Sequence, residues 1–249
     1  MTIPRRGLIF GEMAEEYDRW RPGYPDAAVE WLAPGAPATV VEIGAGTGRL
    51  TNLLLAHGLE VDAVEPDPRM RAVLARNHPT ARCHASESTS LPVADGSVDA
   101  VLVADAWHWF DAEATMNEVR RVLKPGGWLG LVWNVVAEPV ADWEKALAGA
   151  PDMYDRTTKG GPEGVSRRLP LAGPDELEFA QLEWVWELTP EHRAANLATT
   201  SLAIAMGPEE REQWLDAARA ELQQVCDEAG RTAMPVRHLA SCTRWTPRG

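Results

Sequence analysis

The sequence is poor in cysteine and has no long apolar run. Its three cysteines, Cys83, Cys226 and Cys242, stand far apart in 249 residues, and no His or Cys spacing typical of a metal site occurs. This usage predicts reduced thiols and no bound metal. No apolar stretch approaches the roughly 20 residues of a membrane-spanning helix, and no signal-peptide core follows the N-terminal arginines. We therefore expect a soluble, cytoplasmic protein.

Positive charge is also scarce, because 24 Lys and Arg face 37 Asp and Glu and give a formal net charge of −13. Binding to nucleic acid or to an anionic membrane depends on clustered Lys and Arg, so the sequence predicts neither partner. A small molecule is the expected partner, and a homodimer stays open. Apolar residues make up 45% of the chain, which is enough for a full core in one sizeable domain.

The chain does contain a regular alternation of two kinds of segment. Short apolar or β-branched runs alternate with amphipathic runs that end near Gly or Pro. The expected strands are 38–43, 60–66, 81–85, 98–104 and 128–134, and the expected helices between them are 48–58, 67–79 and 111–127. Such alternation predicts parallel βαβ units with helices on both faces of the sheet. Further on, 178–189 and 234–245 are typical of strands, and about 190–230 is typical of helices.

Three glycines follow the first expected strand, in VVEIGAGTGRL at 40–50. Ligands of open α/β sheets bind outside the carboxyl ends of the strands, so this turn is the expected cofactor site. The dinucleotide fingerprint G-x-G-x-x-G requires its third glycine at position 49, where this chain has Arg49. A bulky side chain there obstructs the close approach of helix and strand, which argues against a nicotinamide dinucleotide.

The same stretch resembles the first motif of class I S-adenosylmethionine-dependent methyltransferases, E/D-x-G-x-G-x-G. The resemblance continues in VEPDPRM at 64–70, in ASESTSLPVADGSVDAVLVADAWHWF at 85–110 and in VRRVLKPGGWLGLVW at 119–133. Two further segments, FGEMAEEYDRWRPGYP at 10–25 and DAWHWFD at 105–111, are similar to a small-molecule subgroup of these enzymes. That subgroup is methyltransferase type 11, which includes trans-aconitate methyltransferase-like proteins.

This resemblance implies an α/β fold, the Rossmann-like seven-strand class I methyltransferase sandwich, with a mostly parallel sheet and an antiparallel last strand. We expect a single methyltransferase domain over 1–249. Within it, 1–30 forms an N-terminal lid helix region and 38–134 the cofactor-binding core. Residues 135–249 complete the sheet and elaborate the acceptor site with a helical insertion at about 190–230.

The resemblance also implies a cofactor, S-adenosyl-L-methionine, with S-adenosyl-L-homocysteine as product. The residues expected to bind it are Tyr17, Arg21, Glu42, Gly44, Ala45, Gly46, Thr47, Glu65, Pro66, Met70, Ser86, Glu87, Asp105 and Ala106. Glycines let the backbone approach the methionine end, and the helix N-terminus after the turn favours its carboxylate by about 0.3–1 kcal/mol. Arg21 pairs with that carboxylate if the lid closes. Glu42 either faces the ammonium or caps backbone N–H groups, and Met70 packs either on adenine or in the core.

The expected function is transfer of a methyl group to O, N, S or C of a small-molecule acceptor by in-line displacement. Alignment of the reactants alone supplies about 7–11 kcal/mol, so the sequence need not contain an obvious catalytic side chain. His108, just past the fourth strand, and Tyr17, in the lid, are the candidates for a base, although both fit structural roles equally well. The alternative is an S-adenosylmethionine-binding protein of the same fold that transfers no methyl group.

Eleven tryptophans are a large number for a chain of 249 residues. Trp20, Trp143, Trp184 and Trp186 are candidates for the walls of an acceptor pocket, although core packing is the commoner role of tryptophan. An acidic acceptor needs cations instead, and the second half of the chain offers Arg193, Arg237 and His238. The sequence alone does not orient them.

Overall fold

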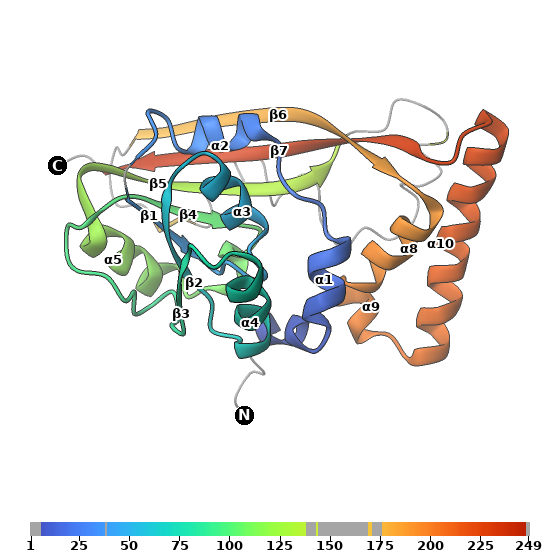
Figure 1. The fold of residues 1–249 in the computed structure, drawn as a ribbon, viewed down its shortest axis with the longest axis horizontal. Helices are drawn as coiled ribbons and strands as arrows, with labels where there is room; N and C mark the ends of the chain where they lie inside the picture. Colours follow the sequence, from blue (N-terminus) through green and yellow to red (C-terminus); the bar gives the residue numbers. More distant parts are fainter. Residues whose placement is uncertain (1–5, 38, 138–142, 144–168, 171–175, 248–249) are drawn as a thin grey trace.

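The structure is a computed structural model that describes residues 6–37, 39–137, 143, 169–170 and 176–247. A seven-stranded sheet runs through it in the order β3-β2-β1-β4-β5-β7-β6 (Figure 1). The strands are β1 Thr39–Ile43, β2 Glu60–Val64, β3 Arg82–His84, β4 Val98–Ala104, β5 Leu123–Val136, β6 Glu176–Leu188 and β7 Met234–Thr246. Much of the segment expected to link the core to β6 lies outside the described residues.

Strand directions confirm the predicted sheet. The pairs β1–β2, β2–β3, β1–β4 and β4–β5 are parallel. The last strand, β7, inserts antiparallel between β5 and β6, as expected. The register places Val136 of β5 opposite His238 of β7 and His238 opposite Trp184 of β6. Two long strands, β7 and β6, thereby extend the sheet beyond β5.

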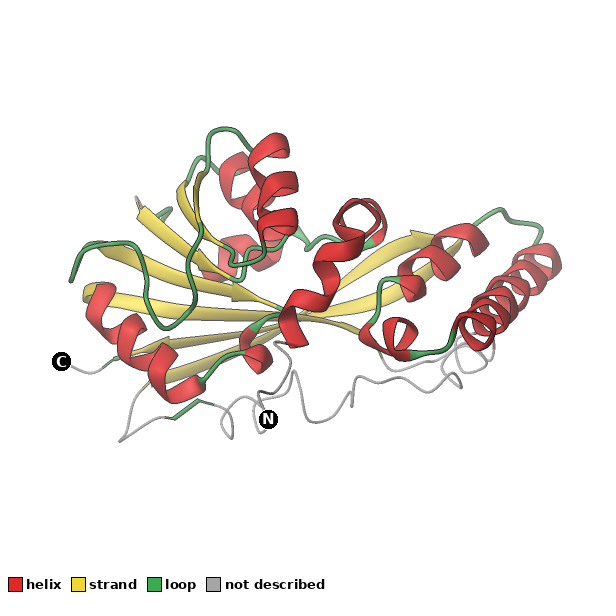
Figure 2. Ribbon diagram, turned by 90° about the horizontal axis from the view of Figure 1, so that it is seen from below, coloured by secondary structure: helices red, strands yellow, loops and turns green. Residues whose placement is uncertain are grey.

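Helices cover both faces of the sheet (Figure 2). The helices are η1 Arg6–Met13, α1 Ala14–Trp20, α2 Asp26–Leu32, α3 Arg49–Ala56, α4 Pro68–Asn77, η2 Trp107–Trp109, α5 Ala112–Val122, α8 Pro190–Ala198, α9 Ser201–Ala205 and α10 Pro208–Ala229. Leu32 of α2, Leu54 of α3 and Leu74 of α4 are fully buried in one cluster on one face. Val119 of α5 and Trp107 belong to the cluster on the other face. Burying each such side chain stabilises the fold by about 1.5–3 kcal/mol.

One predicted boundary is wrong. The helix expected over 111–127 ends at Val122, and β5 begins at Leu123, which pairs with Val98 of β4. Pro125 has no N–H for a helix, so the chain changes to strand before it. The lid bounds of 1–30 stay a prediction; within them, Ala28 of α2 is fully buried in the core cluster.

The predicted helices at 190–230 are confirmed as α8, α9 and α10. They gather around the projecting ends of β6 and β7, at the opposite end of the molecule from α5 (Figure 1). Leu188, Leu222 and Met234 are buried in the cluster that joins α10 to these strands. Between this end and the core, α1 contacts both α4 and α8. Among the described helices, none has the length and apolarity of a membrane span.

Candidate cofactor and acceptor site

The turn after β1 needs its glycines. Gly44, Gly46 and Gly48 have φ angles of 69°, 60° and 96°, which L side chains rarely adopt. A Cβ on Gly44 would lie 2.8 Å from the Cβ of Ala106, and one on Gly48 would lie 2.6 Å from Cδ1 of Leu74. The first glycine therefore brings the turn against the end of β4, and the third packs it against α4.

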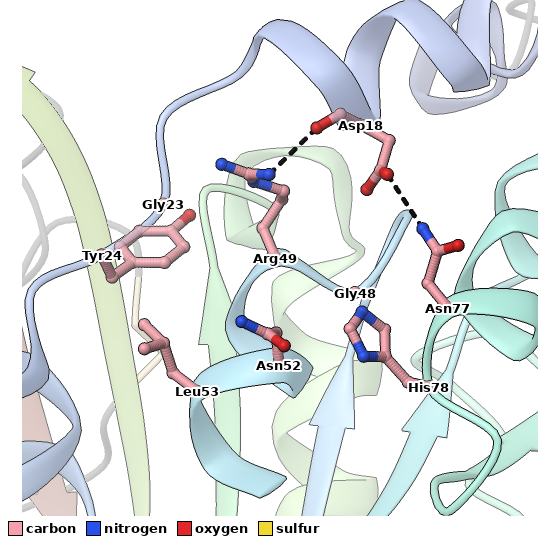
Figure 3. A pocket seen from close by; sticks show the side chains of 9 residues that line it. All are labelled: Asp18, Gly23, Tyr24, Gly48, Arg49, Asn52, Leu53, Asn77 and His78. Atoms are coloured by element: carbon pink, nitrogen blue, oxygen red, sulfur yellow. Dashed lines mark hydrogen bonds between the residues drawn. The ribbon is translucent and has the colours of Figure 1, made fainter. Parts of the chain in front are cut away.

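Arg49, which stands where a dinucleotide fingerprint has glycine, binds the lid. Its Nη1 donates to the carbonyl oxygen of Asp18 at 2.9 Å, while Asn77 Nδ2 donates to Asp18 Oδ2 at 2.9 Å (Figure 3). Beside these bonds lies a cavity of about 310 Å³ between α1, the segment after it, α3 and the end of α4. Its lining residues are Asp18, Gly23, Tyr24, Gly48, Arg49, Asn52, Leu53, Asn77 and His78.

Glu65, directly after β2, orders the glycine turn. Its Oε2 accepts the N–H of Gly46 at 2.8 Å, and its Oε1 accepts the N–H of Asp67 at 2.8 Å. Burial raises the pKa of Glu65, although both N–H groups act against that shift. A carboxylate oxygen can accept more than one hydrogen bond, so both oxygens keep acceptor capacity for ribose hydroxyls. Pro66 is exposed, and Asp67 caps α4 by accepting the N–H groups of the first turn.

The lid packs on α4 through an apolar cluster. Met70, which is 6% exposed, is buried with Phe10 and Ala14 of the N-terminal segment. Tyr17 packs against the same cluster, with its ring centroid 5.6 Å from that of Phe10. The guanidinium of Arg21 lies 5.1 Å from the Tyr17 ring centroid. Both predicted lid residues thus lie together, and Met70 lies beneath the lid.

Asp105 follows β4 in a left-handed conformation, with a φ of 49°. Its Oδ2 accepts the hydroxyl of Tyr24 at 2.7 Å and the N–H of Asn134 at 3.4 Å. Burial raises the pKa of Asp105 to about 6, while Tyr24, Asn134 and Arg21 favour the ionised form. Tyr24 was not predicted as a site residue. The signal that could have found it is RPGYP, where a tyrosine stands between two helix-breaking prolines.

Asn134, at the carboxyl end of β5, joins three elements. Its Nδ2 donates to the carbonyl oxygen of Gly23 at 2.6 Å, and its Oδ1 accepts the indole N–H of Trp184 at 3.2 Å. Together with the bond to Asp105, these contacts tie the segment after α1 to β4, β5 and β6. Asn134 is a second residue that the sequence analysis missed, because its partners lie far away in sequence.

Of three further predicted cofactor residues, Glu42 and Ser86 are bonded to other parts of the protein. Glu42, 1% exposed, accepts the hydroxyl of Thr51 on α3, and burial raises its pKa to about 8. Its carboxylate thus packs under the glycine turn, bonded to a helix side chain. Ser86 and Glu87 belong to the turn after β3. The Ser86 hydroxyl donates to the Ser90 carbonyl oxygen, and Glu87 is exposed.

His108 lies in η2, three residues past Asp105, so it lies near the carboxyl edge as predicted. It is half-buried, and its ring centroid is 4.5 Å from that of Trp109. Ala106, predicted to border the cofactor, is 9% exposed and faces Gly44.

The second half of the chain brings aromatic rings together beside Asn134. Trp184 and Trp186 of β6 lie with ring centroids 5.1 and 5.7 Å from His238 of β7. His192 of α8 lies 5.6 Å from Trp186 and 4.8 Å from Trp20 of α1. Nδ1 of His238 is 3.1 Å from the carbonyl oxygen of Val236, and burial lowers the pKa of this imidazole.

The remaining candidates in this half are placed elsewhere. Trp143 packs on the cluster between α10 and the strands. Arg237, on the other side of β7 from His238 in the alternation of the strand, pairs with Glu183 at 3.2 Å. The imidazole and the three tryptophans therefore come together, whereas Arg237 does not join them.

The residues present fit S-adenosylmethionine. The turn carries no side chain at Gly44 and Gly46, where a Cβ would meet Ala106 and Met70, and Glu65 holds a carboxylate beside the turn. The hydroxyl of Thr47 is fully buried and has no hydrogen-bond partner among the described residues. Buried polar atoms are ordinarily satisfied, so an orphan in the turn points to a polar ligand. The turn thus lies beside a negative charge and beside groups that can accept hydrogen bonds from hydroxyls and amines. These features match a nucleoside with an amino acid tail.

The comparisons with known proteins agree. Residues 41–131 match the family model described as "Methyltransferase domain". An uncharacterized methyltransferase of Mycobacterium tuberculosis is 38% identical over 249 residues, covering 99% of each chain. The structure of an Anaeromyxobacter dehalogenans protein assigned as a type II methyltransferase has a TM-score of 0.63 and 25% identity, covering 92% of this chain and 97% of that one.

A more distant neighbour shares only the fold. It is the Haemonchus contortus phosphoethanolamine N-methyltransferase 2, solved with S-adenosyl-L-methionine, with a TM-score of 0.57 and 16% identity. The match covers 100% of this chain and 61% of that one. The fold and the glycine turn define a class I enzyme of Rossmann-like architecture. The chain belongs to the S-adenosylmethionine-dependent methyltransferases, so the predicted enzyme class and cofactor are confirmed.

Proposed function

We propose that this methyltransferase acts on a small-molecule acceptor bound between its lid and the α8–α9 region. S-adenosylmethionine supplies a methyl group activated by positive sulfur. The chain's own contribution is to bind it, to align the acceptor and to exclude water. The proposed cofactor residues are those expected from the sequence, with Glu65 and the glycine turn at their centre.

One observation carries this proposal: the lid meets α8 across the site. Arg21 Nη2 donates to the carbonyl oxygen of Thr199 at 2.9 Å, and Asn196 Nδ2 donates to that of Trp20 at 3.1 Å. Gly23 and Tyr24, which follow, are bonded to the ends of β5 and β4. A segment that crosses the carboxyl edge and docks on the far side favours a small acceptor over a folded macromolecule.

The net charge of −13 supports the same conclusion, since nucleic acids are repelled by such a surface. Tyr17 and His108 stay candidates for contact with the acceptor, because Tyr17 belongs to the lid and His108 follows the end of β4. Trp184, Trp186 and His238 are the proposed acceptor wall. Their rings lie beside Asn134, which itself contacts the lid and Asp105.

The test uses full-length protein, cofactor labelled in its methyl group and a metabolite extract passed through a filter that removes macromolecules. We expect S-adenosylhomocysteine to form and the label to appear in small molecules. Parallel reactions contain nucleic acid or protein in place of the filtrate. Label transfer confined to those reactions would contradict a small-molecule acceptor.

A further inference from the structure

Asp105 is held in a conformation that the chain must enforce. Its φ of 49° is left-handed, a conformation that is unfavourable for a non-glycine residue. Among the described non-glycine residues, Ala36 alone shares this region, in an exposed turn. Strained backbone concentrates where function requires a particular side-chain position. The strain at the end of β4 therefore indicates that function requires this position of the Asp105 carboxylate.

The bonds to this carboxylate leave one oxygen open. Within the described part of the chain, the hydroxyl of Tyr24 and the N–H of Asn134 both donate to Oδ2. Tyr24 reaches Asp105 from the segment after α1, across 81 positions of sequence. Oδ1 keeps its lone pairs for a ligand. Asp105 therefore has its full set of hydrogen-bond donors only when the N-terminal segment that carries Tyr24 is docked.

The charges around Asp105 set its affinity for a proton. Burial raises its pKa to about 6, and Arg21 opposes that shift from the end of the lid. Burial and the neighbouring Asp105 raise the pKa of Tyr24 well above the ordinary value, with smaller contributions from Tyr17 and Glu42, so Tyr24 stays a donor. A base whose pKa lies near the working pH is the most effective general base. His108, in η2, is another titratable group next to this edge.

We propose that Asp105, positioned by Tyr24, accepts the proton of a methyl acceptor whose attacking nitrogen or oxygen carries one. This inference rests on the small-molecule function proposed above. It also narrows the acceptor, because a carboxylate acceptor has no proton to lose and would be repelled by Asp105. Amines and hydroxyl compounds are the acceptor class that suits this site.

The step balances without a further reactant. The lone pair of the acceptor atom forms the new bond to the methyl carbon, and the electron pair of the methyl–sulfur bond returns to sulfur. The acceptor's N–H or O–H bond breaks, and its proton passes to Oδ1 of Asp105. The carboxylic acid then releases the proton to solvent when the lid opens.

The first test is a carbon-13 NMR titration of the full-length protein labelled at the aspartate carboxyl carbons, with Asp105 assigned from Asp105→Asn. Asn tolerates left-handed backbone, so this variant keeps the turn. We expect a midpoint near pH 6 that rises by roughly one unit in Tyr24→Phe, because the donor to the ionised form is lost. Tyr17→Phe, the matched lid variant, should leave the midpoint unchanged. A midpoint below pH 4, or a midpoint that does not change in Tyr24→Phe, would overturn the proposal.

The second test compares turnover with cofactor binding, using an acceptor from the filtrate screen. Asp105→Asn should lower kcat by about 10²–10⁴-fold, a loss much larger than any accompanying loss of calorimetric affinity for S-adenosylhomocysteine. The acid limb of log kcat against pH should vanish in Asp105→Asn and move to higher pH in Tyr24→Phe. A large loss of cofactor affinity with kcat intact would instead make Asp105 a partner of the cofactor ammonium. An unchanged pH profile, or a carboxylate as the acceptor, also overturns the proposal.

Failure of the proposed function looks different. Label found only in macromolecules overturns the small-molecule acceptor, yet the same kcat comparison on that macromolecule still decides the role of Asp105. Conversely, wild type that methylates a small molecule with kcat dependent on His108 and not on Asp105 overturns only the assignment of the base.

Discussion

The two halves of the carboxyl edge are built from different parts of the chain. At β1, β2 and β4, the site consists largely of backbone: left-handed glycines, and N–H groups that bind the Glu65 carboxylate. At β5, β6 and β7, the polar and aromatic groups belong to side chains, chiefly Asn134, Trp184 and His238. The family model matches 41–131, so it includes β1, β2 and β4 and ends within β5, before Asn134.

This difference separates the part of the site that tolerates sequence change from the part that does not. A site formed by backbone groups needs only glycines and one acid, so it survives wide change in the surrounding sequence. A site formed by side chains changes with each substitution. We therefore infer that the first half binds the cofactor common to the family, whereas the second half and the lid select the acceptor.

The sharpest way to break the comparison is to put a methyl group on the cofactor turn. Gly44→Ala places a Cβ 2.8 Å from Ala106 at a φ of 69°, and it should weaken S-adenosylhomocysteine binding by at least about 100-fold, or 2.8 kcal/mol. Gly58→Ala is the matched control, since its φ is 78° and nothing lies within 4 Å of the new Cβ. Calorimetry should find normal affinity in the control. Equal losses of affinity in both variants would mean that backbone strain, and not the contact with Ala106, is responsible.

The acid beneath the turn has a measurable effect on stability. The pKa of Glu42 is raised to about 8 by burial, so the folded state holds a proton that the unfolded state releases above about pH 4.5. Unfolding free energy is therefore lost as the pH rises toward 8. Between pH 6 and pH 8, wild type should lose about 2 kcal/mol relative to Glu42→Gln in urea denaturation.

A control with the opposite sign is Glu118→Gln. Arg121 lowers the pKa of Glu118, so its contribution is complete above the unfolded value and is constant between pH 6 and pH 8. A difference between wild type and Glu42→Gln that does not change with pH would show that the buried carboxyl is ionised throughout.

On the acceptor side, Trp184→Phe removes the indole N–H that Asn134 accepts. The loss of one hydrogen bond of about 1–1.5 kcal/mol should raise the acceptor KM by about tenfold and leave S-adenosylhomocysteine affinity unchanged. Trp186→Phe, which alters a neighbouring ring without touching Asn134, is its control. Weakened cofactor binding in Trp184→Phe would remove the division between the two halves.

The smallest expected effect concerns the lid. Arg49→Met deletes the bond to the Asp18 carbonyl oxygen and should reduce cofactor affinity by about threefold to tenfold, because the lid docks less firmly. Arg76→Met deletes the exposed pair with Glu15 and should change affinity by less than about twofold. Similar losses in both variants, measured by calorimetry, would mean that Arg49 acts only as a surface charge.

Local patterns explain what the sequence could predict. The glycine turn and the alternation of strands and helices depend on neighbours within a few positions, so the core was foreseen, whereas the antiparallel last strand was expected from the family resemblance. The end of α5 was misplaced, because strand pairing of Leu123 with Val98 overrides local helix propensity. The contacts of Tyr24 and Asn134 depend on distant residues: Tyr24 bonds to Asp105 across 81 positions, and Asn134 bonds to Asp105 across 29 positions and to Gly23 across 111. Only the flanking prolines of RPGYP mark Tyr24 locally.

The central claim is that the cofactor lies on the β1–β4 half with its reactive side turned toward the second half. A crystal structure of the full-length protein with S-adenosylhomocysteine tests it most directly. We predict that the ribose contacts Glu65, the amino acid tail lies on Gly44 to Thr47, and the sulfur faces Asp105 and Asn134. Cofactor bound chiefly by β6 and β7, or a sulfur turned away from Asp105, would contradict the account.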